Sequence, residues 1–187
     1  LVMADFIISR SNRGFNFILK RSVSSTLIDE LAPFAKFNSV TFVENKSKVI
    51  GMISNKNEKL EAFAKNELFS TYVYILNDET TPNVSISYEN WEAGNKILGN
   101  YFLESDDIGK FRPLELNYDK LRVSFEKGCF RGQEIVARMK YLGIDRRSFL
   151  TFIASNEFEA NDDIRIVGKK IEIDNKLVFN GIVKKDL

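Results

Sequence analysis

The sequence contains no histidine, one cysteine and three prolines among its 187 residues. Without histidine, the chain lacks the commonest general base and the commonest metal ligand. This excludes Ser-His-Asp catalysis, Cys-His catalysis and His-ligated zinc within the chain. The single cysteine, Cys129, cannot form a disulfide within the chain, and alone it cannot hold an iron–sulfur cluster. A low cysteine content fits a reducing compartment.

Long apolar runs and a large net charge are also missing. No run approaches the roughly 20 apolar residues of a membrane-spanning helix, and no signal peptide is visible. The net charge is +1, so the total charge indicates no general attraction to nucleic acid or acidic membranes. We therefore expect no membrane partner, and a location in the cytoplasm, or in the mitochondrial matrix if the source is eukaryotic.

Short β-prone segments and helical patterns alternate along the first half of the chain. Residues 2–8 and 15–19 flank the turn residues 11–14 and predict a hairpin. The pattern then predicts a helix over 26–36 capped within 24–26 and interrupted at Pro33, strands at 40–43 and 49–53, a helix over 60–68, and a strand at 72–76. This order favours an α+β fold with mainly antiparallel sheets.

The second half leads into a β-rich end. It predicts a strand at 84–88, an irregular stretch over 90–117, a strand at 121–125, a helix from Gly132 to Gly143, and strands at 149–153, 164–167, 170–173 and 177–183. We interpret residues 1–147 as an α+β core and 148–187 as a small, incomplete C-terminal β-barrel. Residues 1–6 resemble a strand already under way, so we expect that upstream sequence is missing.

One segment combines a thiol, a lysine and the start of a helix. A strand is predicted to run into Lys127-Gly128-Cys129, and a Gly-Gln-Glu step opens the next helix. A helix N-terminus and a nearby ammonium group both favour a thiolate, so Cys129 is a candidate reactive thiol with Lys127 beside it. The alternative is a small buried core cysteine, which is where most free cysteines lie.

Two further features indicate ligand binding. Between residues 120 and 147 there are eight basic and three acidic side chains, which suit either an anionic ligand such as a polyglutamate tail or RNA, or a merely solvated helix face. Glu92 follows the only tryptophan, Trp91, and precedes Gly94. A carboxylate beside an aromatic ring can hold the amino-pyrimidine edge of a heterocycle, although a surface Glu beside a core Trp is the simpler interpretation.

The octamer Lys-Gly-Cys-Phe-Arg-Gly-Gln-Glu at 127–134 resembles the K-G-C-[FY]-x-G-Q-E motif of the YgfZ family, which is related to the T-protein (aminomethyltransferase) of the glycine cleavage system. The resemblance continues downstream in 135–138, Gly143 and 146–147, and upstream in 121–125. Glu92-Ala93-Gly94 is similar to the E-A-G step of both families. Residues 4–23 resemble the middle of the folate-binding domain.

This resemblance implies a T-protein-type fold that binds tetrahydrofolate or a derivative and ends in a β-barrel. It makes Glu92 the pterin-binding carboxylate with Trp91 beside it, and Cys129 and Lys127 the candidate catalytic pair. The further candidate folate contacts are Gly128, Gln133, Glu134 and Arg138. The family's role implies maintenance or repair of iron–sulfur enzymes and a link to tRNA modification, so those enzymes and tRNA are expected partners.

Two departures and two alternatives accompany this interpretation. Family members carry an additional N-terminal segment that closes the folate site and holds the T-protein's catalytic aspartate. We expect that this segment is missing here. The stretch between Leu76 and Trp91 is short for the family. The alternative functions are an aminomethyltransferase of the glycine cleavage type, and a non-catalytic tRNA-binding factor that uses the basic face of 120–147.

Overall fold

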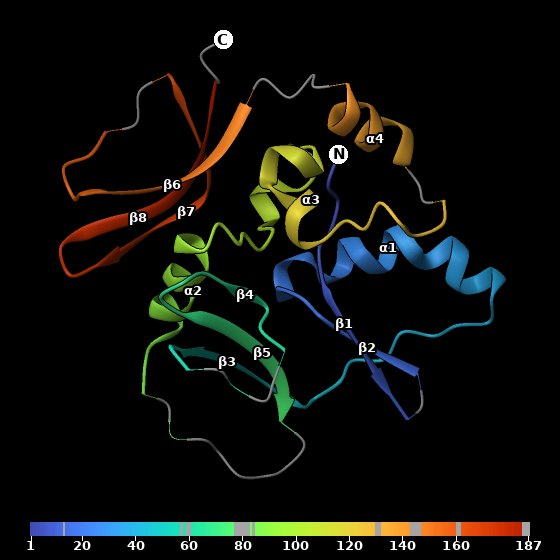
Figure 1. Ribbon diagram of the computed structural model, residues 1–187. Helices are drawn as coiled ribbons and strands as arrows, with labels where there is room; N and C mark the ends of the chain where they lie inside the picture. Colours follow the sequence, from blue (N-terminus) through green and yellow to red (C-terminus); the bar gives the residue numbers. More distant parts are fainter. Residues whose placement is uncertain are drawn as a thin grey trace.

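The fold is α+β, with three separate antiparallel sheets and four α-helices in the part of the chain that the structure describes (Figure 1). The computed structural model describes residues 1–12, 14–56, 58, 61–76, 83, 85–129, 132–142, 147–159 and 162–184. The predicted fold class and the antiparallel sheets are therefore confirmed. Leu60, Val84, Gly143, Arg146, and Phe130 and Arg131 of the octamer lie outside the described residues.

The N-terminal hairpin and the first helix follow the sequence pattern, with altered bounds. β1 (Ile7–Ser11) pairs with β2 (Gly14–Ile18), and α1 (Arg21–Phe37) follows. α1 begins five residues earlier than predicted, because Val23 and Leu27, one turn apart, are its buried residues. The sequence predicted an interruption at Pro33, but α1 continues through that residue and ends at Phe37.

The strand predicted at 40–43 is absent, and the helix predicted over 60–68 is wrong. Residues 40–43 form no strand, although Phe42 lies against Phe17 with 6.5 Å between ring centroids. β4 (Ala64–Lys65) stands in place of the helix and pairs with β5 (Ser70–Leu76). The Asn66 side chain accepts hydrogen bonds from the amides of Leu68 and Phe69, so an Asx turn outcompetes the helical pattern.

β5 is the central strand of the second sheet, with β3 (Lys48–Ser54) on its other edge. α2 (Tyr88–Ile97) packs on this sheet and lies where the sequence predicted a strand at 84–88 followed by irregular chain. The Oγ of Ser87 accepts a hydrogen bond from the amide of Asn90 and caps the helix.

Short helical turns connect α2 to the C-terminal half. They are η1 (Ser105–Asp107), η2 (Pro113–Leu116) and α3 (Tyr118–Leu121). The strand predicted at 121–125 is therefore wrong: Leu121 ends α3, and the amides of Arg122 and Val123 both donate to the carbonyl of Tyr118. α4 (Gln133–Tyr141), with Gly132 as its N-cap, confirms the helix predicted to begin at Gly132.

The C-terminal strands form one sheet in the order β6 (Arg147–Ser155), β8 (Lys176–Lys184), β7 (Ile164–Ile173). Asp174 and Asn175, both with positive φ, make the predicted turn between β7 and β8. Within the described residues this sheet has two open edges, so the region predicted as a small, incomplete β-barrel is an open three-stranded sheet. The division into 1–147 and 148–187 stays a prediction.

The largest core cluster joins the two ends of the chain to its middle. Its buried members are Val2, Val23, Tyr101, Leu103, Phe111, Leu116, Tyr118, Phe149, Val167 and Ile182. α2 contacts β3 and β5 on one side and β7 and β8 on the other, and Figure 1 shows it between the two sheets. Of the helices that the structure describes, none has the length and apolar character needed to cross a membrane.

The contact between α2 and β3 depends on the absence of a side chain at Gly51. A Cβ added at Gly51 would lie 2.5 Å from Cε2 of Trp91. We predict that Gly51→Ala lowers the free energy of unfolding by about 1–3 kcal/mol, because the indole must move out of a packed site. Urea unfolding measures this, with Gly128→Ala as the matched control, since a Cβ there meets nothing within 4 Å. Equal effects of both substitutions would contradict the prediction.

Candidate functional site

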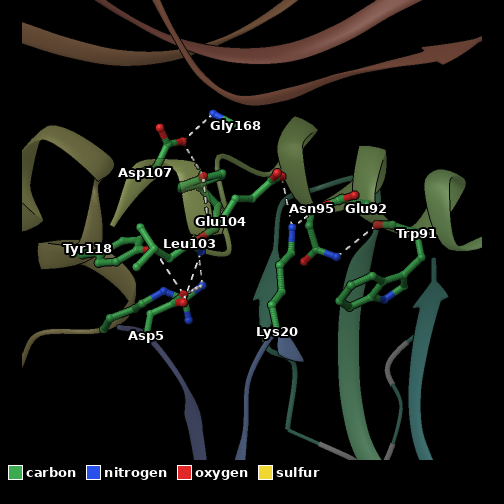
Figure 2. Close-up of polar contacts among 12 residues, drawn as sticks. Asp5, Lys20, Trp91, Glu92, Asn95, Leu103, Glu104, Asp107, Tyr118 and Gly168 are labelled. Atoms are coloured by element: carbon green, nitrogen blue, oxygen red, sulfur yellow. Dashed lines mark hydrogen bonds and ion pairs between the residues drawn. The ribbon is translucent and has the colours of Figure 1, made fainter. Parts of the chain in front are cut away.

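The carboxylate of Glu92 lies in the middle of the molecule and is bound by a lysine from far away in the sequence. Nζ of Lys20 lies 2.5 Å from Oε1 of Glu92 and 3.2 Å from Oε1 of Glu104. The three side chains are between 10% and 19% exposed. Figure 2 shows Lys20 pointing between the two carboxylates, one from α2 and the other from the segment before η1. This Lys20–Glu92–Glu104 cluster is the candidate site.

Burial and charge act in opposite directions on this lysine. Burial by itself lowers the pKa of Lys20, but the hydrogen bond and the charge of Glu92 outweigh it and raise the pKa above its usual value. Burial also raises the pKa of the nearby Tyr88. Lys20 therefore stays an ammonium ion at neutral pH and neutralises one of the two carboxylates it contacts.

A second lysine, Lys96, lies one helical turn after Glu92 and has no such partner. Its side chain is 2% exposed, and among the described residues no acceptor hydrogen-bonds its Nζ. Nζ lies 5.5 Å from the ring centroid of Tyr101. Burial lowers the pKa of Lys96, and the nearby charge of Glu92 only partly opposes this. An unsatisfied buried donor is unusual and leaves a hydrogen bond available for an acceptor on a ligand.

A chain of hydrogen bonds connects the cluster to the C-terminal sheet. The hydroxyl of Tyr101 accepts from the amide of Glu104 and donates to Oδ2 of Asp107, at 2.7 Å. That same oxygen accepts from the amide of Gly168 in β7, at 2.8 Å (Figure 2). Gly168 has φ +66°, and a Cβ there would lie 2.6 Å from Tyr101, so glycine is required for this close approach. The position of Glu104 is thus tied to β7.

Trp91, the predicted aromatic partner of a heterocycle, is engaged in packing. Its ring lies over Gly51 and near the rings of Tyr88 and Phe102, at 5.9 and 5.6 Å between centroids. Its Nε1 is buried and has no hydrogen-bond partner in the described part of the chain. These contacts fix α2 on the sheet and thereby orient Glu92. A direct role of Trp91 in binding folate stays a prediction.

The octamer at 127–134 does not lie with the Lys20–Glu92–Glu104 cluster. Cys129 is exposed, three residues before Gly132, which is the N-cap of α4. Lys127 and Gly128 are exposed as well, so the alternative of a buried core cysteine does not hold. α2 and α4 are well apart in Figure 1, with α3 between them in that view. The site residues predicted from the sequence thus fall into two groups, one around Glu92 and one around the start of α4.

α4 carries the remaining predicted contacts, and part of its charge is neutralised. Arg138 pairs with Glu134 at 2.6 Å, and both side chains are exposed. Lys140 pairs with Asp119 of α3 at 2.8 Å. Arg122, counted in the sequence as part of the basic face, is instead 10% exposed and contacts Asp5 at 3.4 Å. The basic face is therefore weaker than the sequence indicates.

Comparison with known proteins gives a consistent set of relatives. An uncharacterized protein of Haemophilus influenzae is 29% identical over 166 residues, which cover 87% of this chain and 58% of that protein. The tRNA-modifying protein YgfZ of Escherichia coli is 28% identical over 191 residues, which cover 84% of this chain and 59% of YgfZ. The chain is a homologue of YgfZ. The resemblance to YgfZ predicted from the octamer is thereby confirmed.

The homology covers most of this chain but only part of each relative. The chain spans just under three fifths of the length of these two relatives. No family model matches the chain. No solved structure gives a significant match.

Sequence analysis did not identify three residues at the site: Lys20 and Glu104 of the cluster, and Lys96 beside it. Lys20 and Glu104 are 72 and 12 positions from Glu92, and although Lys20 lies in the segment 4–23 that resembles the folate-binding domain, no spacing connects either residue with Glu92. Lys96 is four residues after Glu92, and on a helix that spacing places both on one face. The signal was present at Ser87, whose cap would have identified α2 and, with it, Lys96 as a neighbour of Glu92.

Lys96 gives a prediction with a defined pH dependence. Its pKa in the folded state lies below the unfolded value, so the unfolded chain binds the proton more tightly and stability rises as pH approaches 10.5. We predict that Lys96→Met stabilises the fold by about 1–3 kcal/mol at pH 7, because it removes an unsatisfied buried donor. This gain shrinks towards pH 10. Urea unfolding at pH 7, 8.5 and 10 measures it.

The exposed Lys36, in the last turn of α1, is the matched control. Lys36→Met should change the unfolding free energy little at any of the three pH values. A destabilised Lys96→Met variant, or a gain that does not vary with pH, would show that the buried amine has a partner.

Proposed function

We propose that this chain is the folate-binding part of a YgfZ-type factor linked to tRNA modification, and that Glu92 binds the pterin ring of tetrahydrofolate. The observation that carries the proposal is the mostly buried Glu92 carboxylate with its charge partner Lys20, which also contacts Glu104. The YgfZ homology and the name of that relative, a tRNA-modifying protein, support the wider role.

The residues around Glu92 fit the chemistry of the group. The 2-amino group and the adjacent ring N–H of a pterin are donors, and a carboxylate can accept from both. The neighbouring ring carbonyl is an acceptor, and the orphaned Nζ of Lys96 lies one turn along the same helix. When bound, tetrahydrofolate would supply one-carbon transfer chemistry; the protein residues named here only bind and orient it.

The finer predictions from the family belong to the same proposal. They are a T-protein-type arrangement of the sheets, a role in maintaining or repairing iron–sulfur enzymes in the cytoplasm, and the octamer thiol Cys129 with Lys127 as its functional pair. The exposure of Cys129 supports access by a partner or substrate.

Folate binding is tested by a single substitution with a neighbour as control. We predict that Glu92→Gln weakens binding of 5-formyltetrahydrofolate by about 10- to 100-fold, because it replaces an anionic acceptor by an amide that also presents N–H donors. Isothermal titration calorimetry measures it. Glu89→Gln, in the exposed first turn of α2, should bind like the parent chain. If the parent and the Glu92→Gln chain bound 5-formyltetrahydrofolate with equal affinity, the proposal would be wrong.

We also propose that α4 contacts tRNA directly. Arg138 and Lys140 have side chains that are 58% and 41% exposed, and Tyr141 beside them is 71% exposed. Basic groups contact phosphates, and an exposed ring can stack on an unpaired base. The tRNA-modifying relative supports RNA as the partner of this face.

Charge reversal at these positions separates RNA binding from folate binding. We predict that the Arg138→Glu, Lys140→Glu variant binds tRNA several-fold more weakly, and that the slope of log affinity against log salt falls by about one for each phosphate that the variant no longer neutralises. Lys65→Glu, on the exposed part of β4, is the control. Filter binding between 50 and 200 mM salt measures both quantities. Affinity that is indifferent to salt in the parent chain would rule out this interface.

A further inference from the structure

Lys20 occupies the carboxylate that the proposed ligand needs. Its Nζ lies 2.5 Å from Oε1 of Glu92, which is within charge-assisted hydrogen-bonding distance. An amino-pyrimidine edge that donates two hydrogen bonds to a carboxylate takes both of its oxygens. An ammonium ion this close to Oε1 therefore competes with the ligand for the same acceptor.

The backbone holds Lys20 where it can reach two acceptors. Lys20 is the N-cap of α1, and its carbonyl accepts a hydrogen bond from the amide of Val23, which is fully buried. The side chain extends from this fixed point to the cluster. Glu104, whose Oε1 lies 3.2 Å from Nζ, is an acceptor that remains when Glu92 is taken.

The charges around the ammonium group favour an exchange rather than a release into solvent. Lys20 is 19% exposed at its side chain, and Glu104 is 10% exposed. When the Lys20 ammonium group moves from Glu92 to Glu104, it stays paired with a carboxylate throughout. Neither the ammonium group nor Glu104 is then left as an isolated buried charge. The hydrogen bond from the Glu104 amide to Tyr101, and through Asp107 to Gly168, holds this second acceptor in place.

We propose that Lys20 is an internal counter-ion that competes with the ligand for Glu92 and is transferred to Glu104 when the ligand binds. This inference rests on the proposed binding of folate by Glu92. Lys20 is thus a residue that sets folate affinity without contacting folate. The affinity of the chain is lower than its pterin-binding groups alone would give, because the ion pair must be broken first.

Two substitutions with opposite expected effects test it. Lys20→Met removes the competitor and should tighten binding of 5-formyltetrahydrofolate by about tenfold. Glu104→Gln weakens the alternative acceptor and should loosen binding by about threefold. Calorimetric titration of the full chain measures both. Arg21→Met is the matched control: Arg21 is adjacent in sequence, its side chain is 93% exposed, and the variant should bind with the affinity of the parent.

The outcomes separate this inference from the proposed function. A Lys20→Met chain that binds more weakly than the parent, or equally, overturns the competition, whereas the parent and Glu92→Gln comparison still stands. A chain that binds no folate either as parent or as Lys20→Met, while remaining folded by circular dichroism, overturns both proposals. Tighter binding by Glu104→Gln would overturn the exchange of partners, even if Lys20→Met failed to fold.

Discussion

The buried guanidinium of Arg122 is the interaction on which the arrangement of the middle of the chain depends. It donates hydrogen bonds to Oδ1 of Asn100 and to the carbonyl of Tyr101, at 2.9 and 3.0 Å, and it contacts Asp5. It also lies about equally far from three aromatic rings, those of Phe63, Phe102 and Tyr118. One side chain thus joins the N-terminal segment, the residue before β4, the segment that follows α2, and α3.

The partner of Arg122 shows why this position tolerates little change. Burial raises the pKa of Asp5, although Arg122, the Tyr118 hydroxyl and the Leu103 amide all favour its charged form. Removal of the guanidinium would leave a nearly buried acid without its main cation, which in other proteins costs about 3–5 kcal/mol. The segment from Asn100 to Glu104 that Arg122 fixes is the same segment that carries Glu104 into the candidate site.

The sequence predicted the elements whose signals are local. The turn residues of the first hairpin and of the β7–β8 connection require positive φ or polar side chains, and both turns are present. β4 was missed because Asn66 binds backbone amides and defeats a helical spacing of apolar residues. α2 was missed because its apolar positions are few, and its stability comes from packing against two sheets.

The same difference between local and long-range signals applies to the candidate site. Glu92 and the octamer could be identified from their resemblance to a family, but Lys20, which binds Glu92, comes from a distant segment of the chain. Lys20 meets Glu92 across 72 residues and Glu104 across 84. No periodicity encodes such pairs, because they follow from the tertiary arrangement of segments far apart in the sequence. For the same reason, Arg122 was counted on a surface when it belongs to the interior.

The placement of α2 has a thermodynamic consequence for any ligand of Glu92. Ala93 packs on Ile171 and Val178 of the C-terminal sheet, and Asn95 accepts from the Thr71 hydroxyl of β5. The helix that carries Glu92 is therefore held by both sheets. A ligand that binds there stabilises the native chain as a whole, so occupancy will register as a rise in the melting temperature of the entire molecule.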